Sequence, residues 1–230
     1  MTLVEGWTLV VPIKRLDQAK SRLALPSDAR AALALAMALD TVDAVLGATS
    51  VARLVIVTSE EQVRTALDGM PRVQWLDDPD AGLAGAIARG QDHLSVSATG
   101  TGPSAILLGD LPALRPAELD AGLAAARGHQ RAMVPDAEGT GTTLLTAGRA
   151  QDLRPQFGHG SRAAHEAAGH RVLDQAGPGL RRDVDTAADL AQAIRLGVGR
   201  ATADVLAGLT VQLGVPPGER AAGSTTAERT

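Results

Sequence analysis

The stretch Ser104-Ala-Ile-Leu-Leu-Gly-Asp-Leu-Pro112 joins a buried strand to an acidic side chain. Its apolar run has no polar alternation, which is typical of a strand that is covered on both faces in a parallel sheet. Pro112 blocks continuation of the strand, so that Asp110 lies at its carboxyl end. In open parallel sheets the ligand crevice lies at this end of the strands. The stretch therefore predicts both an α/β fold and a candidate site residue.

Two apolar runs nearer the N-terminus have the same character. Leu9-Val-Val-Pro-Ile13 and Arg53-Leu-Val-Ile-Val-Thr58 each read as a buried strand, and an Ala/Leu helix pattern over residues 29–46 separates them. The alternation continues, with strands expected at 73–76, 131–134, 142–145 and 171–173 and helices at 60–67, 83–94, 116–126, 161–168 and 187–196. This order predicts a single three-layer α/β domain with a mostly parallel sheet over residues 1–208. The last stretch, 209–230, is poor in apolar residues and is expected to be a disordered tail.

The composition excludes several classes of function. The chain of 230 residues has no cysteine, which rules out disulfides, thiolate metal sites and a cysteine nucleophile. Its formal net charge is −4 and its aromatic residues are one Phe and two Trp, so no nucleic-acid partner is expected. No apolar stretch reaches the roughly 18 residues of a membrane span, and no secretory leader pattern is present. We expect a cytoplasmic protein without membrane contact.

The two lysines of the chain lie close together, just after the first strand. They are Lys14 and Lys20, among 22 basic residues in all. A lysine ammonium is a compact charge on a flexible stem, which suits a phosphate whose geometry changes during a reaction. Chance clustering explains two residues about equally well when the pattern is taken alone. Lys14 is the stronger candidate because it directly follows the strand, whereas Lys20 is expected only to help hold a phosphate.

Two carboxylates from distant parts of the chain could share a metal ion. Asp110 follows a buried strand, and Asp183 lies in Arg181-Arg-Asp-Val-Asp-Thr186, near a junction of strand and helix. Oxygen ligands of this kind suit Mg²⁺, which takes one or two protein carboxylates together with phosphate oxygens. The alternative for Asp110 is a plain turn before proline. Asp185 or Thr186 is expected to cap the following helix, which leaves Asp183 free for a metal.

Glycine-rich loops supply further candidates for anion binding. Gly139-Thr-Gly-Thr-Thr143 and Phe157-Gly-His-Gly-Ser161 could offer backbone N–H groups to a phosphate or carboxylate, although such loops are more often plain turns. Gly82-Leu-Ala-Gly-Ala86, after Asp77-Asp78-Pro79, would place a helix N-terminus near a nucleotide base. The histidines of the C-terminal half (His159, His165 and His170) lack metal-ligand spacing and are expected at the surface or in loops.

Together these motifs resemble the guanylyltransferase family of deazaflavin-coenzyme (F-420) biosynthesis. The resemblance rests on Val11-Pro-Ile-Lys-x-Leu-x-x-Ala-Lys-Ser-Arg-Leu23, Leu108-Gly-Asp-Leu-Pro112, Gly139-Thr-Gly-Thr-Thr143, Phe157-Gly-x-Gly-Ser161 and Arg182-Asp-Val-Asp-Thr186. It runs from about Trp7 to Gly208. It implies a single-domain Rossmann-like nucleotidyltransferase fold, shared with the molybdenum-cofactor guanylyltransferases. It also implies a reaction of GTP with a small phosphorylated three-carbon acid, which gives a guanosine diphosphodiester and pyrophosphate.

The resemblance also implies roles for individual residues. By this resemblance, Asp110 and Asp183 are expected to bind Mg²⁺. Lys14 is expected to be a catalytic residue together with these two carboxylates. Thr143, Gly158 and Ser161 resemble the pocket for the acid. The expected nucleotide contacts are Lys14, Lys20, Arg22, Asp78, Gly82 and Leu83. The partners so implied are GTP, the acid and a downstream transferase that takes the product, while the oligomeric state stays open.

One departure from the family pattern concerns the loop after Phe157. A proline is expected at its centre, and here His159 stands instead. The composition is typical of a GC-rich genome and favours phosphoenolpyruvate, the bacterial substrate, over the archaeal 2-phospho-L-lactate, with phosphoglycerate left open. Another nucleotidyltransferase of the same fold is a rival, but its Leu-x-Gly-Gly-x-x-x-Arg-x-Gly loop is absent. A nucleotide-binding module without catalysis is a second rival.

Overall fold

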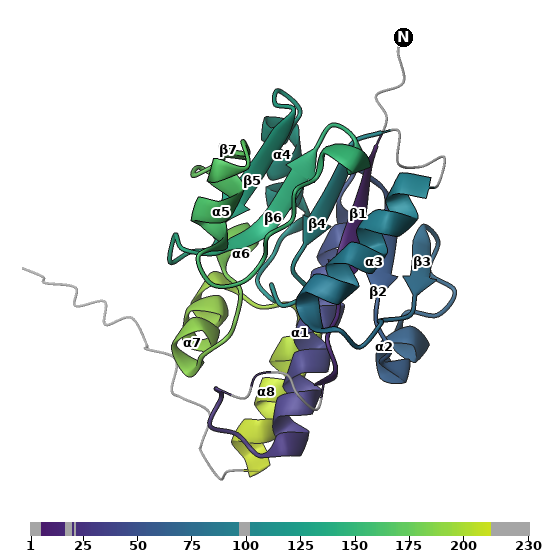
Figure 1. Cartoon of the computed structure of the whole chain (residues 1–230). Coiled ribbons are helices and arrows are strands. Elements are labelled where there is room, and N and C mark those ends of the chain that lie inside the picture. Colours follow the sequence, from purple (N-terminus) through teal and green to yellow (C-terminus); the bar gives the residue numbers. More distant parts are fainter. Residues whose placement is uncertain (1–5, 17–19, 21, 97–101, 213–230) are drawn as a thin grey trace, which may run out of the picture.

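Seven strands form one sheet between layers of helices (Figure 1). The computed structural model describes residues 6–16, 20, 22–96 and 102–212. The strands run in the order β3-β2-β1-β4-β6-β5-β7. Within the sheet, β6 runs antiparallel to both of its neighbours and the other pairings are parallel. The strands are β1 (Trp7–Pro12), β2 (Val51–Val57), β3 (Val73–Leu76), β4 (Ser104–Leu107), β5 (Arg131–Pro135), β6 (Thr142–Ala147) and β7 (Arg171–Val172).

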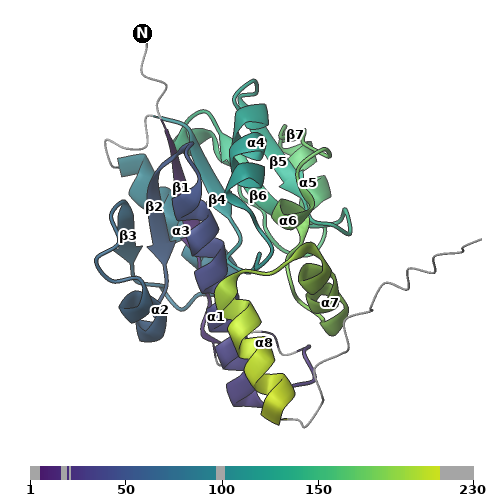
Figure 2. The same ribbon diagram turned by 180° about the vertical axis from the view of Figure 1, so that it is seen from behind.

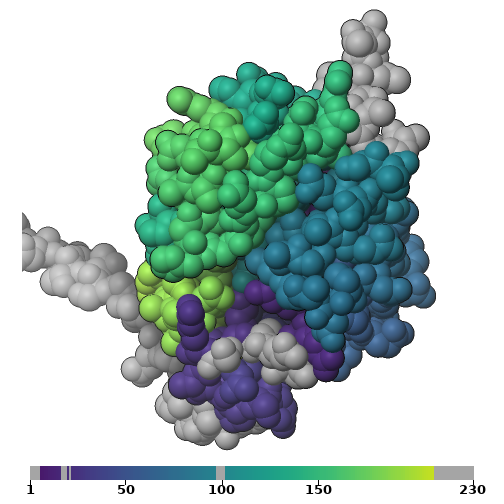
Figure 3. All heavy atoms as spheres, viewed as in Figure 1, coloured from purple at the N-terminus to yellow at the C-terminus, as the bar shows by residue number. Residues whose placement is uncertain are grey.

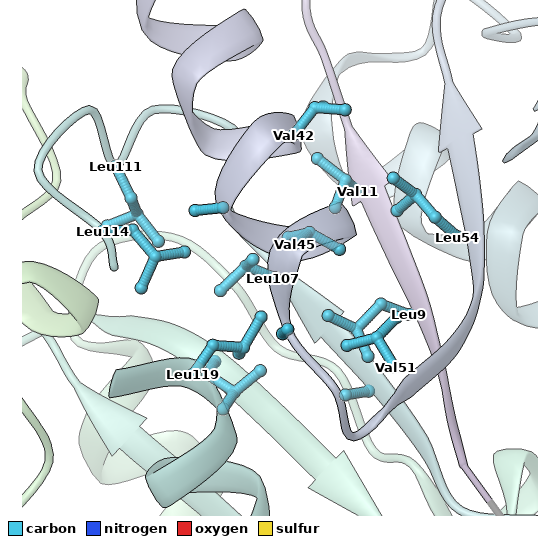
Figure 4. Packing of buried hydrophobic residues seen from close by; sticks show 14 of the residues in the cluster. Leu9, Val11, Val42, Val45, Val51, Leu54, Leu107, Leu111, Leu114 and Leu119 are labelled. Atoms are coloured by element: carbon cyan, nitrogen blue, oxygen red, sulfur yellow. The ribbon is translucent and has the colours of Figure 1, made fainter. Parts of the chain in front are cut away.

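The central strands are buried on both faces, as their apolar sequences predict. On one face Leu9 and Val11 of β1 pack with Val42 and Val45 of α1 (Ser27–Gly47), in the core shown in Figure 4. On the other face Val10 belongs to a second core, to which α3 (Gly82–Val96) contributes. Helices therefore cover both faces of the sheet, which confirms the three-layer α/β prediction.

The remaining helices complete the arrangement around the sheet. Behind the sheet in Figure 1, α4 (Pro116–Ala126) and α6 (Pro178–Arg181) lie on the same face as α1 (Figure 2). The other elements are α2 (Glu61–Ala66), the 3-10 helix η3 (Ala150–Asp152), α5 (Ser161–Ala167), α7 (Ala187–Leu196) and α8 (Arg200–Gln212). Within the described part of the chain, no helix is both long and apolar enough to span a bilayer.

Helix α8 is the main element that the sequence did not predict. It lies along α1 beyond the end of the sheet (Figure 2). The Asp40 carboxylate of α1 accepts hydrogen bonds from the backbone N–H groups of Ala201 and Thr202, at 2.9 and 2.8 Å. The helix continues to Gln212, so residues 209–212 are helical rather than part of a tail. The rest of the predicted tail lies outside the described residues.

The strands that follow β1 in the sequence lie on both sides of it in the sheet. From β1 the chain passes through α1 to β2 and β3 on one side, and then through α3 to β4 on the other side. A crevice therefore opens at the carboxyl ends of β1 and β4, where open α/β sheets bind their ligands. Because β6 is antiparallel, its first residues lie beside these ends, and Leu107 pairs with Leu144. This arrangement brings distant segments to one edge of the sheet.

Candidate active site

A cleft of about 820 Å³ lies at this edge of the sheet. In Figure 3 the surface is hollowed between the blue-teal α3 and the green segment after β6. A volume of this order holds a nucleotide together with a small second ligand. Eight of the predicted site residues line the cleft: Lys14, Lys20, Arg22, Leu83, Asp110, Gly158, Ser161 and Asp183. The structure thus gathers strand ends, two loops and one helix start around one space.

Lys20 forms the central ion pair of the cleft. Its Nζ lies 2.5 Å from Oδ2 of Asp110 and 3.4 Å from Oδ1 of Asp185. The Lys20 side chain is 7% exposed and Asp110 is 28% exposed, so water screens their attraction only partly. Burial opposes the lysine charge, but the attraction of Asp110, followed by that of Asp185, outweighs burial and raises the pKa of Lys20. Lys20 is therefore a permanent positive charge within the cleft.

Lys14 differs from Lys20 in its surroundings. It follows β1 directly, as predicted, but its side chain is exposed at the cleft wall. Lys14 forms no hydrogen bond or ion pair with the residues that the structure describes. The exposed Arg22 also lines the cleft. Lys20 is thus the lysine engaged with the carboxylates, while the predicted role of Lys14 toward the phosphates stays a prediction.

Asp183 lies in a strongly acidic environment. Burial, followed by the negative charges of Asp110, Asp185 and Asp136, raises its pKa to about 8. The backbone reinforces this proximity, because the N–H of Val184 donates to the carbonyl of Asp110 at 3.2 Å. The structure therefore brings together the two carboxylates that the sequence proposes as metal ligands, although they come from positions 73 residues apart in the chain.

The donor set of the cleft fits a divalent cation. Oδ1 of Asp110 is buried and has no hydrogen-bond partner among the described residues. Asp136, Glu138 and Asp183 each offer a carboxylate oxygen within 4.8 Å of the others. Mg²⁺ and Mn²⁺ prefer hard oxygen ligands such as these carboxylates, which repel one another when no cation is bound between them. Positive charge placed among them would relieve the repulsion that adds to the effect of burial on the pKa of Asp183.

Sequence reasoning missed Asp136 and Glu138 in this cluster. Asp136 directly follows β5, a predicted strand, so the rule that identified Asp110 could have found it. Both side chains also have protein partners. The Asp136 carboxylate accepts the N–H groups of Thr140 and Gly141, at 2.8 and 2.7 Å, and Glu138 pairs with Arg182 at 2.6 Å. Both residues therefore shape the loop before β6 as well as adding negative charge.

The predicted acid pocket is only partly exposed to the cleft. Gly158 and Ser161 line it, but Thr143 does not. The Thr143 side chain is fully buried, and its hydroxyl donates to the carbonyl of Leu180 at 2.7 Å. Its neighbour Thr142 lines the cleft instead. The period-2 alternation of β6 explains the difference, because successive side chains point to opposite faces.

The predicted base-binding segment contributes little to the cleft wall. Leu83 lines the cleft, whereas Asp78 and Gly82 do not. The Asp78 carboxylate accepts the N–H of Asp80 at 2.9 Å, and Gly82 begins α3 with a φ of 70°. These two residues form the turn that starts the helix.

The expectation that the three histidines lie at the surface or in loops is wrong for His165, which is fully buried within α5. His159 is exposed on its loop, and His170 lies in the connection between α5 and β7, although it is only 3% exposed. Both ring nitrogens of His165 have hydrogen-bond partners, Thr142 and Gln156. A satisfied imidazole can be buried at little cost, and the sequence does not show which partners will be available.

A family model described as "Guanylyl transferase CofC like" matches residues 7–227. The chain belongs to this family of CofC-like guanylyltransferases. Phosphoenolpyruvate guanylyltransferase of Salinispora arenicola is 50% identical over 206 residues, which cover 87% of this chain and 94% of the relative. The enzyme of the same name from Streptomyces coelicolor is 47% identical over 208 residues, covering 89% and 98%. The resemblance inferred from the motifs is thereby confirmed.

The solved structure of a 4-diphosphocytidyl-2C-methyl-D-erythritol synthase shares the fold of this CofC-like chain. The TM-score is 0.58 at 13% sequence identity, and the match covers 84% of this chain and 98% of that structure. At such low identity the likeness concerns the fold alone. It confirms the Rossmann-like α/β class predicted from the sequence.

Proposed function

We propose that this CofC-like chain joins GTP to phosphoenolpyruvate, giving enolpyruvyl-2-diphospho-5′-guanosine and pyrophosphate, as an early step of coenzyme F-420 biosynthesis. The single observation that carries the proposal is the match of nearly the whole chain to relatives of this name. The site supports it, because the cleft combines crowded carboxylates with Lys14, Lys20 and Arg22. Cations and carboxylates around one space suit the binding of anionic phosphates together with a metal.

The reaction needs no covalent enzyme intermediate. A phosphate oxygen of the acid attacks the α-phosphorus of GTP, a new P–O bond forms, and the bond from the α-phosphorus to the bridging oxygen of pyrophosphate breaks. The attacking phosphate is already an anion, so no residue has to remove a proton from it. The remaining task is to hold two polyanions in line.

The positive side chains of the cleft offset the repulsion between the substrates. Negative charge accumulates on the departing pyrophosphate, and a cation held in place before the reaction stabilises that charge without reorganisation. Lys20, fixed by Asp110 and Asp185, is suited to this role. Asp110 and Asp183 would hold Mg²⁺, which supplies further positive charge at the phosphates when bound.

The acid would bind beside the loop that contains Gly158 and Ser161. Both residues line the cleft, and Ser161 begins α5. Thr143 would shape this pocket from beneath rather than by direct contact of its hydroxyl, because that hydroxyl is already bonded to Leu180. His159 lines the same part of the cleft, where the family pattern has a proline.

Pyrophosphate release tests the proposal directly. The purified full chain is incubated with GTP and Mg²⁺, and then with phosphoenolpyruvate, 2-phospho-L-lactate or 3-phosphoglycerate in turn. We expect the highest kcat/KM with phosphoenolpyruvate. Preference for phospholactate would replace the acid in the proposal, and release with none of the three would reject the function.

A further inference from the structure

His165 lies beneath both glycine-rich loops of the predicted acid pocket. Its Nδ1 lies 2.9 Å from Oγ1 of Thr142, where the first loop enters β6. Its Nε2 accepts the backbone N–H of Gln156 at 2.8 Å, just before the second loop. The imidazole thus bridges two segments that are 14 residues apart in the chain. His165 itself does not line the cleft.

The partners fix the tautomer of His165. Because the Gln156 amide donates to Nε2, that nitrogen carries no proton. The neutral ring then carries its proton on Nδ1 and donates to Thr142. The Thr142 hydroxyl in turn donates to the sulfur of Met133 at 3.7 Å, which leaves its oxygen free to accept. The three hydrogen bonds therefore point the same way. Gln156 donates to His165, His165 donates to Thr142 of β6, and Thr142 donates to Met133 of β5.

Other contacts tie the same two loops together. The Phe157 ring packs edge-on against His165, with ring centroids 5.1 Å apart. The backbone N–H of Arg162 donates to the carbonyl of Thr140 at 3.1 Å. Between these anchors, Gly158 and Gly160 have φ values of 134° and 72°, so the loop adopts a shape that depends on glycine. His165 is the side chain that bonds both ends of this arrangement.

We propose that His165 is a positioning residue of the acid pocket, which holds the Phe157-Gly-His-Gly-Ser161 loop at a fixed distance from Thr142 through its two ring nitrogens. The inference rests on the proposed function for the identity of the acid. It concerns binding of the acid rather than the reaction of GTP, because His165 ties the loop to β6, and β4 separates β6 from β1, the strand that Lys14 follows. A positioning error of about 1 Å can cost up to about 100-fold in catalysis.

Three substitutions separate this role from a general packing role. His165→Phe keeps a buried ring and removes both hydrogen bonds. His165→Gln can restore the Gln156 bond, because its side-chain oxygen reaches the place of Nε2. His170→Asn is the matched control. His170 is also buried and contacts the His165 ring with centroids 5.5 Å apart, and among the described residues its side chain bonds the carbonyl of His165 and neither loop.

Steady-state kinetics give the first readout. For His165→Phe we expect KM for phosphoenolpyruvate to rise about tenfold while KM for GTP changes less than twofold. His165→Gln should recover part of the loss, and His170→Asn should leave both KM values near those of the wild type. Equal changes in both KM values, or the same change in His170→Asn, would overturn the positioning role.

Amide hydrogen exchange gives a second readout that needs no turnover. His165→Phe should speed exchange over residues 156–161, with His165→Gln intermediate and His170→Asn unchanged in that segment. Unchanged exchange in His165→Phe would overturn the inference even if the variant is inactive. If the wild type shows no turnover with any acid, the proposed function fails, and exchange alone decides the role of His165 in holding the loop.

Discussion

Lys20 and Asp110 define the chemistry of the cleft at the scale of single residues. A buried ion pair loses much of its hydration, so removing one partner leaves the other charge uncompensated. Asp110 is the carboxylate nearest to Lys20 and is also a proposed metal ligand. We therefore expect the lysine to offset part of the negative charge of the site before substrates bind and to supply positive charge to the phosphates afterwards.

We predict that Lys20→Ala lowers kcat by about 100-fold, the cost of removing one fixed electrostatic donor. Lys14→Ala is the natural comparison, because Lys14 lines the same cleft but is exposed and solvated. It should raise KM for GTP and reduce kcat less than Lys20→Ala does. Steady-state kinetics on the two variants check this order. A larger loss of kcat in Lys14→Ala would show that Lys14, rather than the ion-paired Lys20, is the more important lysine for catalysis.

His165 links stability to pH. Burial, followed by the neighbouring His170, lowers the pKa of His165 from 6.5 to about 4. As pH falls from 6.5 to 4, the unfolded chain takes up a proton at this ring and the folded chain does not. The contribution of neutral His165 to the free energy of unfolding is thus fully present above pH 6.5. It is lost as the pH falls below this value, by on the order of a few kcal/mol at pH 4.

Urea unfolding measured from pH 7.5 down to pH 4.5 tests this dependence. The wild type should lose stability across the window, and His165→Phe should lose clearly less, because phenylalanine takes up no proton. His170, whose pKa burial also lowers, adds to the slope in both proteins. Identical slopes in the wild type and in His165→Phe would contradict the prediction.

At the scale of elements, helix α8 depends on a carboxylate from another helix. The first N–H groups of a helix lack partners within it, and Asp40 of α1 accepts two of them. Apolar side chains of α8, Val205 and Leu206, also pack against the core that includes Leu33 and Met37 of α1. A cap supplied from 161 residues away cannot be recognised from local sequence, which explains why α8 was missed.

We predict that Asp40→Ala lowers the free energy of unfolding by about 2 kcal/mol, because hydrogen bonds to a charged acceptor are each worth more than neutral ones. Asp43→Ala is the control, since Asp43 lies on the exposed face of the same helix. It should change stability by less than about 0.5 kcal/mol. Chemical denaturation monitored by circular dichroism gives both values. Equal effects of the two substitutions would show that the cap does not stabilise the docking of α8.

For the whole molecule, the three-layer α/β architecture and the mostly parallel sheet were predictable from the sequence. Continuous apolar strands such as 104–107 must be buried on both faces, and the helices that alternate with them supply the two covering layers. The positions of Asp110 and Asp183 were also predictable, one from its strand end and both from the family motifs. The burial of Thr143 and His165 was not, because it depends on strand pleat and on partners supplied by other segments. The ion pair of Lys20 with Asp110 likewise joins residues 90 positions apart in the chain, which no local pattern reveals.

The acidic cluster has a consequence for the stability of the whole chain. Burial, followed by the negative charges of the neighbouring aspartates, raises the pKa of Asp183, so ionised Asp183 destabilises the metal-free protein. We predict that Asp183→Asn raises the melting temperature without metal and removes the further rise that Mg²⁺ or Mn²⁺ gives to the wild type. Differential scanning fluorimetry with and without a chelator measures both. An equal metal-induced shift in Asp183→Asn and in the wild type would exclude Asp183 as a ligand.

Transfer of the guanylyl group of GTP to the phosphate of phosphoenolpyruvate can be followed by phosphorus NMR of a reaction with both substrates and Mg²⁺. We expect loss of the GTP and phosphoenolpyruvate signals, together with the appearance of pyrophosphate and of two mutually coupled diphosphodiester resonances. Unchanged phosphoenolpyruvate, or conversion of GTP to GDP and inorganic phosphate, would contradict the proposed transfer.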